Sequence, residues 1–167
     1  MTKTSSRTQI FLARLAVALV LAFVLVGVAR YGISGEVLAR IWQNLLDRPG
    51  GPMVFRFVLQ PVMAAVAALR DGIGDARARR PAFLWSVLSV PAERRARLDE
   101  ALIATARIIL LGLAMDSIYQ FIEFDDFHPG EAVIIALLLA FVPYLLIRGL
   151  VTRVARRWFA ERLSGIR

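Results

Sequence analysis

Residues 100–123 read EALIATARIILLGLAMDSIYQFIE, a nearly continuous apolar stretch with one acidic side chain deep inside it, Asp116. An α-helix needs about 20 apolar residues to cross the ~30 Å hydrocarbon core of a bilayer. An ionisable side chain in such a helix costs about 2.5–3.5 kcal/mol on insertion scales, so it is expected to face protein or water and to have a partner. The stretch therefore predicts a membrane-spanning helix over residues 100–122 that packs against other helices.

The composition is typical of a small membrane protein. The 167-residue chain is 58% hydrophobic and has a net charge of +8, nearly all of it from arginine because Lys3 is the only lysine. We expect a single membrane domain over residues 1–167. The arginines flank the apolar stretches instead of forming a separate basic domain, which favours anionic lipid head groups over nucleic acid as their partners. Because the chain has no cysteine, disulfides and thiolate metal sites are excluded.

Three further segments are predicted to cross the bilayer: residues 9–29, 53–69 and 131–147. The first is interrupted only by Arg14 and is typical of a signal anchor, with a cleaved signal peptide as the competing interpretation. The second is near the lower limit of length for a span and contains Arg56 and Gln60. A re-entrant hairpin is the competing interpretation for this segment.

The distribution of arginine predicts the orientation of the spans. When the four spans alternate, most basic residues fall on one side of the membrane, and the loop over residues 123–130 on the other side is acidic. The positive-inside rule then places both termini and residues 70–99 in the cytoplasm. With both termini on that side, residues 53–69 have to cross the membrane. The basic residues outside this pattern are Arg30, Arg40, Arg48 and Arg56.

Three shorter segments are predicted to be amphipathic helices at the membrane surface: residues 35–47, 82–90 and 150–162. The first places Trp42 at head-group depth, and a docking helix for a partner protein is its alternative interpretation. The second lies in the connection over residues 70–99, where Gly72 and Gly74 are expected to break the helical pattern. The arginines of this connection are expected to form a basic collar against anionic lipid: Arg77, Arg79, Arg80, Arg94, Arg95 and Arg97.

One polar stripe is the candidate binding site. Asp116, Tyr119 and Gln120 lie on one face of the central helix. At 1.5 Å per residue, Asp116 lies ~9 Å below the outer end of its helix, and Arg56 and Gln60 lie ~5 and ~10 Å below the outer end of theirs. We therefore predict that Arg56 pairs with Asp116, and that Gln60, Tyr119 and Gln120 complete the hydrogen bonds.

Three interpretations of this cluster stay open. A structural ion pair between two helices is favoured because intramembrane charges need partners, and the alternatives are a pathway for protons, ions or small solutes and an active site. The sequence has no serine–histidine arrangement, paired-histidine metal motif or glycine-rich phosphate loop, so no enzymatic activity, cofactor or metal is predicted. The single histidine, His128, lies in the acidic loop, where solvated side chains are expected instead of a divalent cation site.

Part of the chain resembles a group of small multi-pass membrane proteins. The segments YQFIEF at residues 119–124 and PGEAVIIALLLAFVPYLLIRG at residues 129–149, followed by a basic end, carry this likeness. They resemble a family of small uncharacterised proteins of the bacterial inner membrane. The resemblance, over residues 119–157, implies a multi-pass bacterial inner-membrane protein and implies no activity.

The sequence as a whole predicts an all-α bundle of four transmembrane helices with amphipathic interfacial helices. Small residues spaced four apart are expected to give two helices faces for close packing: Ala18 and Ala22, and Ala132, Ala136 and Ala140. We expect a non-enzymatic accessory or scaffold subunit that associates with itself or with a larger membrane complex through such faces. The alternative is a small channel or transporter that uses the stripe around Asp116, for which we expect an oligomer that encloses this residue.

Overall fold

The computed structural model describes residues 6–47, 54–123 and 127–164, which form α-helices and no strands. The expectation of an all-α fold is therefore confirmed for the described residues. The helices are α1 (Arg7–Tyr31), α2 (Gly35–Asp47), α3 (Arg56–Arg77), α4 (Phe83–Ser89), α5 (Pro91–Glu123) and α6 (Pro129–Ser164).

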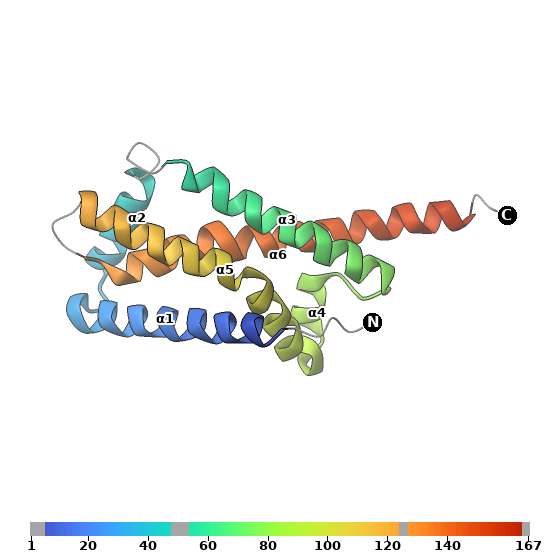
Figure 1. The fold of residues 1–167 in the computed structure, drawn as a ribbon, viewed down its shortest axis with the longest axis horizontal. Coiled ribbons are helices and arrows are strands. Elements are labelled where there is room, and N and C mark those ends of the chain that lie inside the picture. Colours follow the sequence, from blue (N-terminus) through green and yellow to red (C-terminus); the bar gives the residue numbers. More distant parts are fainter. Residues whose placement is uncertain (1–5, 48–53, 124–126, 165–167) are drawn as a thin grey trace.

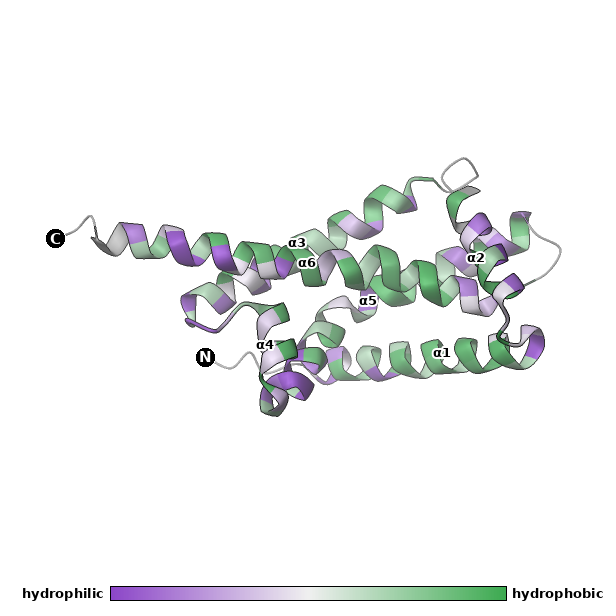
Figure 2. Cartoon of the chain, turned by 180° about the vertical axis from the view of Figure 1, so that it is seen from behind, coloured by the Kyte–Doolittle hydropathy of each residue, from purple (hydrophilic) through white to green (hydrophobic). Residues whose placement is uncertain are grey.

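Four of these helices are long and apolar enough to cross a membrane: α1, α3, α5 and α6. They lie side by side in one elongated bundle (Figure 1). Helix α2 lies at one end of the bundle, and α4 lies at the other end together with both described ends of the chain. Hydrophobic residues dominate the long helices between these ends, whereas hydrophilic residues concentrate near α2, near α4 and along the last turns of α6 (Figure 2).

Local sequence signals explain several of the helix ends. Ser6 and Gln9 form a capping box at the start of α1, in which the Gln9 amide donates to the Ser6 hydroxyl at 3.2 Å and the Ser6 amide donates to Gln9 Oε1 at 2.9 Å. Gly32 ends this helix with a φ of 70°, a conformation that glycine adopts without steric cost. Helices α5 and α6 begin at Pro91 and Pro129, because proline is tolerated in the first helical turn.

Small residues in steps of four form the seam where α3, α5 and α6 meet. In α6 this seam contains Ala132, Ala136 and Ala140, which are fully buried as their spacing predicts. Gly112 of α5 lies so close to α6 that an added Cβ would be 3.0 Å from the Cβ of Ala136. Helices approach this closely only where side chains are small, so the seam sets the separation of the three helices.

Helix α3 is longer than the sequence predicts. The expected span ended at residue 69, and Gly72 and Gly74 were expected to break the helix, but α3 continues through both glycines to Arg77. A Cβ at Gly72 would lie 2.9 Å from the Cβ of Val151 and 3.0 Å from the carbonyl oxygen of Arg148. Gly72 is therefore a close-packing position against α6, and α3 is one continuous helix instead of a re-entrant hairpin. Residues 48–53, where that span was expected to begin, lie outside the described residues.

Helix α6 also differs from the expectation. The segment over residues 150–162 is not a separate interfacial helix, because α6 runs without interruption from Pro129 to Ser164 (Figure 1). Thr152 is fully buried in this part, and its hydroxyl donates to the carbonyl oxygen of Arg148 at 2.7 Å. Val151 packs against Gly72 of α3, whereas most of the described side chains of α6 from Arg153 onward are exposed. Helices α2 and α4 occupy the predicted segments over residues 35–47 and 82–90.

Helix α1 packs against the bundle with only one side. Its buried side chains are Ala13 and Ala16, whereas Ala18 and Ala22, the predicted packing face, are exposed. Near its other end an added Cβ at Gly27 would lie 3.1 Å from the backbone nitrogen of Gly130. Small residues therefore do bring α1 close to α6, at a position other than the predicted one.

Candidate functional site

The predicted ion pair is present in the interior of the bundle. Arg56 Nη1 of α3 lies 2.9 Å from Asp116 Oδ1 of α5, and both side chains are 0% exposed. The Arg56 guanidinium also lies over the ring of Tyr119, with 4.5 Å from its central carbon to the ring centre. This cation–π contact gives Arg56 a second stabilising neighbour.

Gln120 completes this group, which we call the Arg56 cluster: Arg56, Asp116, Tyr119 and Gln120. The Gln120 amide nitrogen donates to Asp116 Oδ2 at 2.7 Å and to the carbonyl oxygen of His128 at 3.1 Å, and Gln120 Oε1 accepts from the His128 backbone amide at 2.6 Å. Gln120 therefore connects the ion pair to the chain that leads into α6. The expectation that Gln60 hydrogen-bonds to the pair is wrong: its amide nitrogen is 4.0 Å from the Met115 sulfur, and its oxygen faces Gly112 without a hydrogen bond among the described residues.

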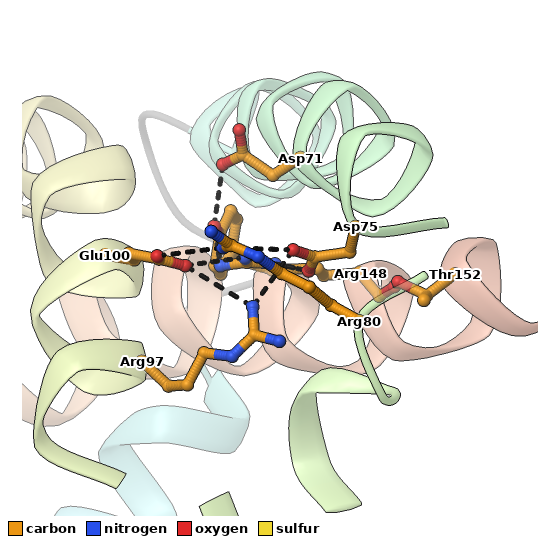
Figure 3. A network of polar contacts seen from close by, with 8 residues as sticks. Asp71, Asp75, Arg80, Arg97, Glu100, Arg148 and Thr152 are labelled. Carbon is orange, nitrogen blue, oxygen red and sulfur yellow. Dashed lines mark hydrogen bonds and ion pairs between the residues drawn. The ribbon is translucent and has the colours of Figure 1, made fainter. Parts of the chain in front are cut away.

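A second and larger polar cluster lies at the α4 end of the bundle (Figure 3). Arg148 of α6 is its centre. Arg148 Nε donates to Asp75 Oδ2 at 2.8 Å, Arg148 Nη2 donates to Glu100 at 3.0 Å, and Arg148 Nη1 donates to the Tyr144 hydroxyl at 2.9 Å. The Tyr144 hydroxyl in turn donates to Asp71 at 2.8 Å.

Two more arginines complete this group. Arg97 Nη1 donates to Asp75 Oδ1 at 2.9 Å, and Arg80 Nη1 donates to Glu100 Oε1 at 3.1 Å. The Arg148 guanidinium also lies over the ring of Phe83, at 4.5 Å from the ring centre, which attaches α4 to the group. We call these residues the Arg148 cluster: Asp71, Asp75, Arg80, Arg97, Glu100, Tyr144 and Arg148. Its three arginines balance its three carboxylates, and it joins α3, α5 and α6.

The sequence analysis missed this second cluster. Arg80 and Arg97 were assigned to a basic collar against lipid, but Arg97 is only 4% exposed and both bind carboxylates. Arg77, Arg79, Arg94 and Arg95 are exposed, as a collar requires. A signal for the cluster was present in α6, since the spacing of four from Ala132 to Ala140 continues to Tyr144 and Arg148.

The chemistry of both clusters is that of closed ion pairs. Buried charges are tolerated when they are paired and hydrogen-bonded. Asp75, Glu100 and Asp116 are paired with arginines from neighbouring helices, and Asp71 accepts a hydrogen bond from Tyr144. Gly112 of α5, which lies between Glu100 and Asp116 in the sequence, packs closely against Ala136 of α6. Asp116 is fully buried by the helices of a single chain. That a channel built on this residue would be an oligomer stays a prediction.

The loop with the single histidine holds a smaller set of contacts. The His128 ring stacks on Tyr31 with 4.8 Å between ring centres, and the Tyr31 hydroxyl donates to the Phe127 carbonyl oxygen at 2.8 Å. These contacts attach the end of α1 to the start of α6. Asp125 and Asp126, which formed part of the acidic loop considered for a cation, lie outside the described residues.

Comparison with protein-family models, with characterised proteins and with solved structures finds no match for this chain. The function therefore has to be argued from the geometry of the helices and their clusters.

Proposed function

We propose that this chain is a non-enzymatic accessory or scaffold subunit of the bacterial inner membrane, with both termini in the cytoplasm. The four long apolar helices support a membrane location, and the arginine distribution supports the orientation. The resemblance over residues 119–157 supports the bacterial inner membrane.

The exposed face of α1 is the observation on which the scaffold proposal rests. Only 11% of the apolar stretch of α1 is buried, compared with 50% for α5. The small residues of α6 are used inside the chain, but Ala18 and Ala22 of α1 are exposed at a spacing that allows another helix to approach closely. This face is available to a second copy of the chain or to a helix of a larger membrane complex.

The alternative function, a channel, would need an open pathway along the polar stripe around Asp116. Asp116 and Gln120 are fully buried, and Gly112 packs against Ala136, so the polar stripe is closed within one chain. A conducting pathway along it requires α3, α5 and α6 to separate. The paired charges of the two clusters oppose such a separation.

Association can be tested on the tagged protein purified in mild detergent, with intact-mass measurement of the complex. We expect a homo-oligomer or a stoichiometric partner, and we expect the double substitution Ala18→Ile, Ala22→Ile to release it, because larger side chains prevent close approach. Ala114→Ile is the matched control, since Ala114 is exposed on α5. A complex that survives the double substitution, or a monomer in the unsubstituted protein, contradicts the proposal.

The same preparations distinguish the channel. Reconstituted into vesicles, the scaffold should show no ion or proton flux above that of empty vesicles. Flux that disappears when Arg56 and Asp116 are replaced together by apolar residues, while assembly persists, supports the channel instead.

A further inference from the structure

A cavity lies at the α2 end of the bundle, between the last turns of α1, the inner side of α2 and the first turns of α6. Its volume is about 200 Å³. The walls are mainly aliphatic, with Val24 and Val28 from α1, Val37 and Ile41 from α2, and Val133 from α6. An apolar cavity of this kind does not suit water, which needs two to four polar partners.

Helix α2 is attached to the bundle along a polar edge of this cavity. The Asn44 amide donates to both carboxylate oxygens of Glu131 at 3.1 and 3.2 Å, and Glu131 is only 3% exposed. The Arg40 guanidinium lies over the ring of Tyr31, at 5.0 Å from its centre. These contacts hold α2 in place without filling the space beneath it with apolar side chains.

The largest described apolar side chains of α2 are exposed, and of these only Leu38 lines the cavity. Leu38, Trp42 and Leu46 lie four residues apart and are 59%, 60% and 66% exposed. This pattern is typical of a helix that lies in the interface of a bilayer with tryptophan at head-group depth. The cavity therefore lies at the depth where acyl chains meet their ester and phosphate groups.

Arg40 gives this apolar cavity one hydrogen-bond donor. Its Nε atom is buried and has no hydrogen bond among the described residues, since Glu131 Oε1 is 3.8 Å away, beyond hydrogen-bonding distance. Part of the same side chain is accessible, with 39% exposed. An occupant with an apolar chain and an oxygen acceptor would fill the space and accept a hydrogen bond from this nitrogen.

We propose that this cavity binds one acyl chain of a glycerophospholipid, with an ester or phosphate oxygen bound to Arg40. Charge complementarity favours this occupant, because Arg40 is cationic and Arg30 is exposed at the same end of α1. The proposal rests on the membrane location argued above but is independent of the association through α1. The lipid site and the association face can therefore fail separately.

The test is intact-mass measurement of bound phospholipid on the protein purified in mild detergent. We expect about one phospholipid per chain to be retained. Val28→Trp fills the cavity and should lower retention about tenfold, which corresponds to about 1.4 kcal/mol of binding free energy. Val26→Trp is the matched control, because Val26 is exposed on α1 and does not line the cavity.

A second pair of variants examines the polar contact and covers the case in which Val28→Trp fails to fold. Arg40→Met should lower phospholipid retention, whereas Arg153→Met, at an exposed arginine of α6 that does not line the cavity, should leave it unchanged. Gel filtration and thermal unfolding of each variant show whether it is folded. Equal retention in all folded variants, retention of detergent or fatty acid in place of phospholipid, or no retained lipid in the unsubstituted protein would overturn the proposal.

Discussion

Arg56 and Asp116 form an ion pair in the interior of the protein. Arg56 and Asp116 are both 0% exposed, so neither can be solvated by water when the other is removed. Loss of one partner from a buried ion pair costs about 3–5 kcal/mol, whereas replacement of both by apolar groups of similar volume is often neutral. Their behaviour in substitution experiments is therefore predicted to be non-additive.

We expect Asp116→Leu alone to lower the stability of the protein by about 3–5 kcal/mol, and Arg56→Met with Asp116→Leu to recover most of that loss. Thermal unfolding in detergent provides the measurement. Arg107→Met is the control, because Arg107 is an exposed arginine of the same helix as Asp116. If the double variant is as unstable as the single one, the pair has a role beyond mutual neutralisation.

Sequence reasoning found this pair because depth along two helices can be counted from residue numbers. The same count placed Gln60 near the pair but could not show which way its amide turns, and its amide nitrogen faces the Met115 sulfur. Helical rise predicts the level of a side chain, whereas its hydrogen-bond partner depends on rotamers and on neighbours from other helices.

At the scale of elements, the ends of α3 and α6 were the least predictable features. Glycines and charges after residue 69 are typical of a loop, yet Gly72 and Asp75 are buried in α3. The carboxylate of Asp75 is neutralised by Arg97 and Arg148, which lie distant in the sequence. Local sequence patterns cannot show that a charged residue has a partner on another helix. A prediction made from them therefore ends α3 too early.

The two glycines of α3 give a direct comparison. Gly72→Ala should destabilise the protein by about 1–3 kcal/mol, because its Cβ would overlap Val151 and the Arg148 carbonyl. Gly74→Ala should be neutral or stabilise by up to about 1 kcal/mol, since nothing lies within 4 Å of an added Cβ and alanine favours the helix. Unfolding midpoints of the two variants measure the difference. A tolerated Gly72→Ala would show that α3 and α6 are less tightly packed than the structure indicates.

For the whole molecule, the arrangement of the helices predicts which ends of the bundle face each side of the membrane. Helices α2 and α4 lie at opposite ends of the bundle, and both described ends of the chain lie at the α4 end (Figure 1). If the four long helices cross a bilayer, residues in α2 and α4 have to face opposite sides. The arginines near α4 then place that end in the cytoplasm by the positive-inside rule.

The absence of cysteine from the sequence makes this orientation measurable with single introduced thiols. Glu36 in α2 and Ser89 at the end of α4 are both exposed. With a thiol reagent that does not cross membranes, Glu36→Cys should be labelled in intact spheroplasts, and Ser89→Cys should be labelled only after permeabilisation. The unsubstituted protein, which has no thiol, is the control. The reverse pattern would show that the orientation is opposite to the predicted one. Labelling of both positions from one side would show that the long helices do not all cross the bilayer.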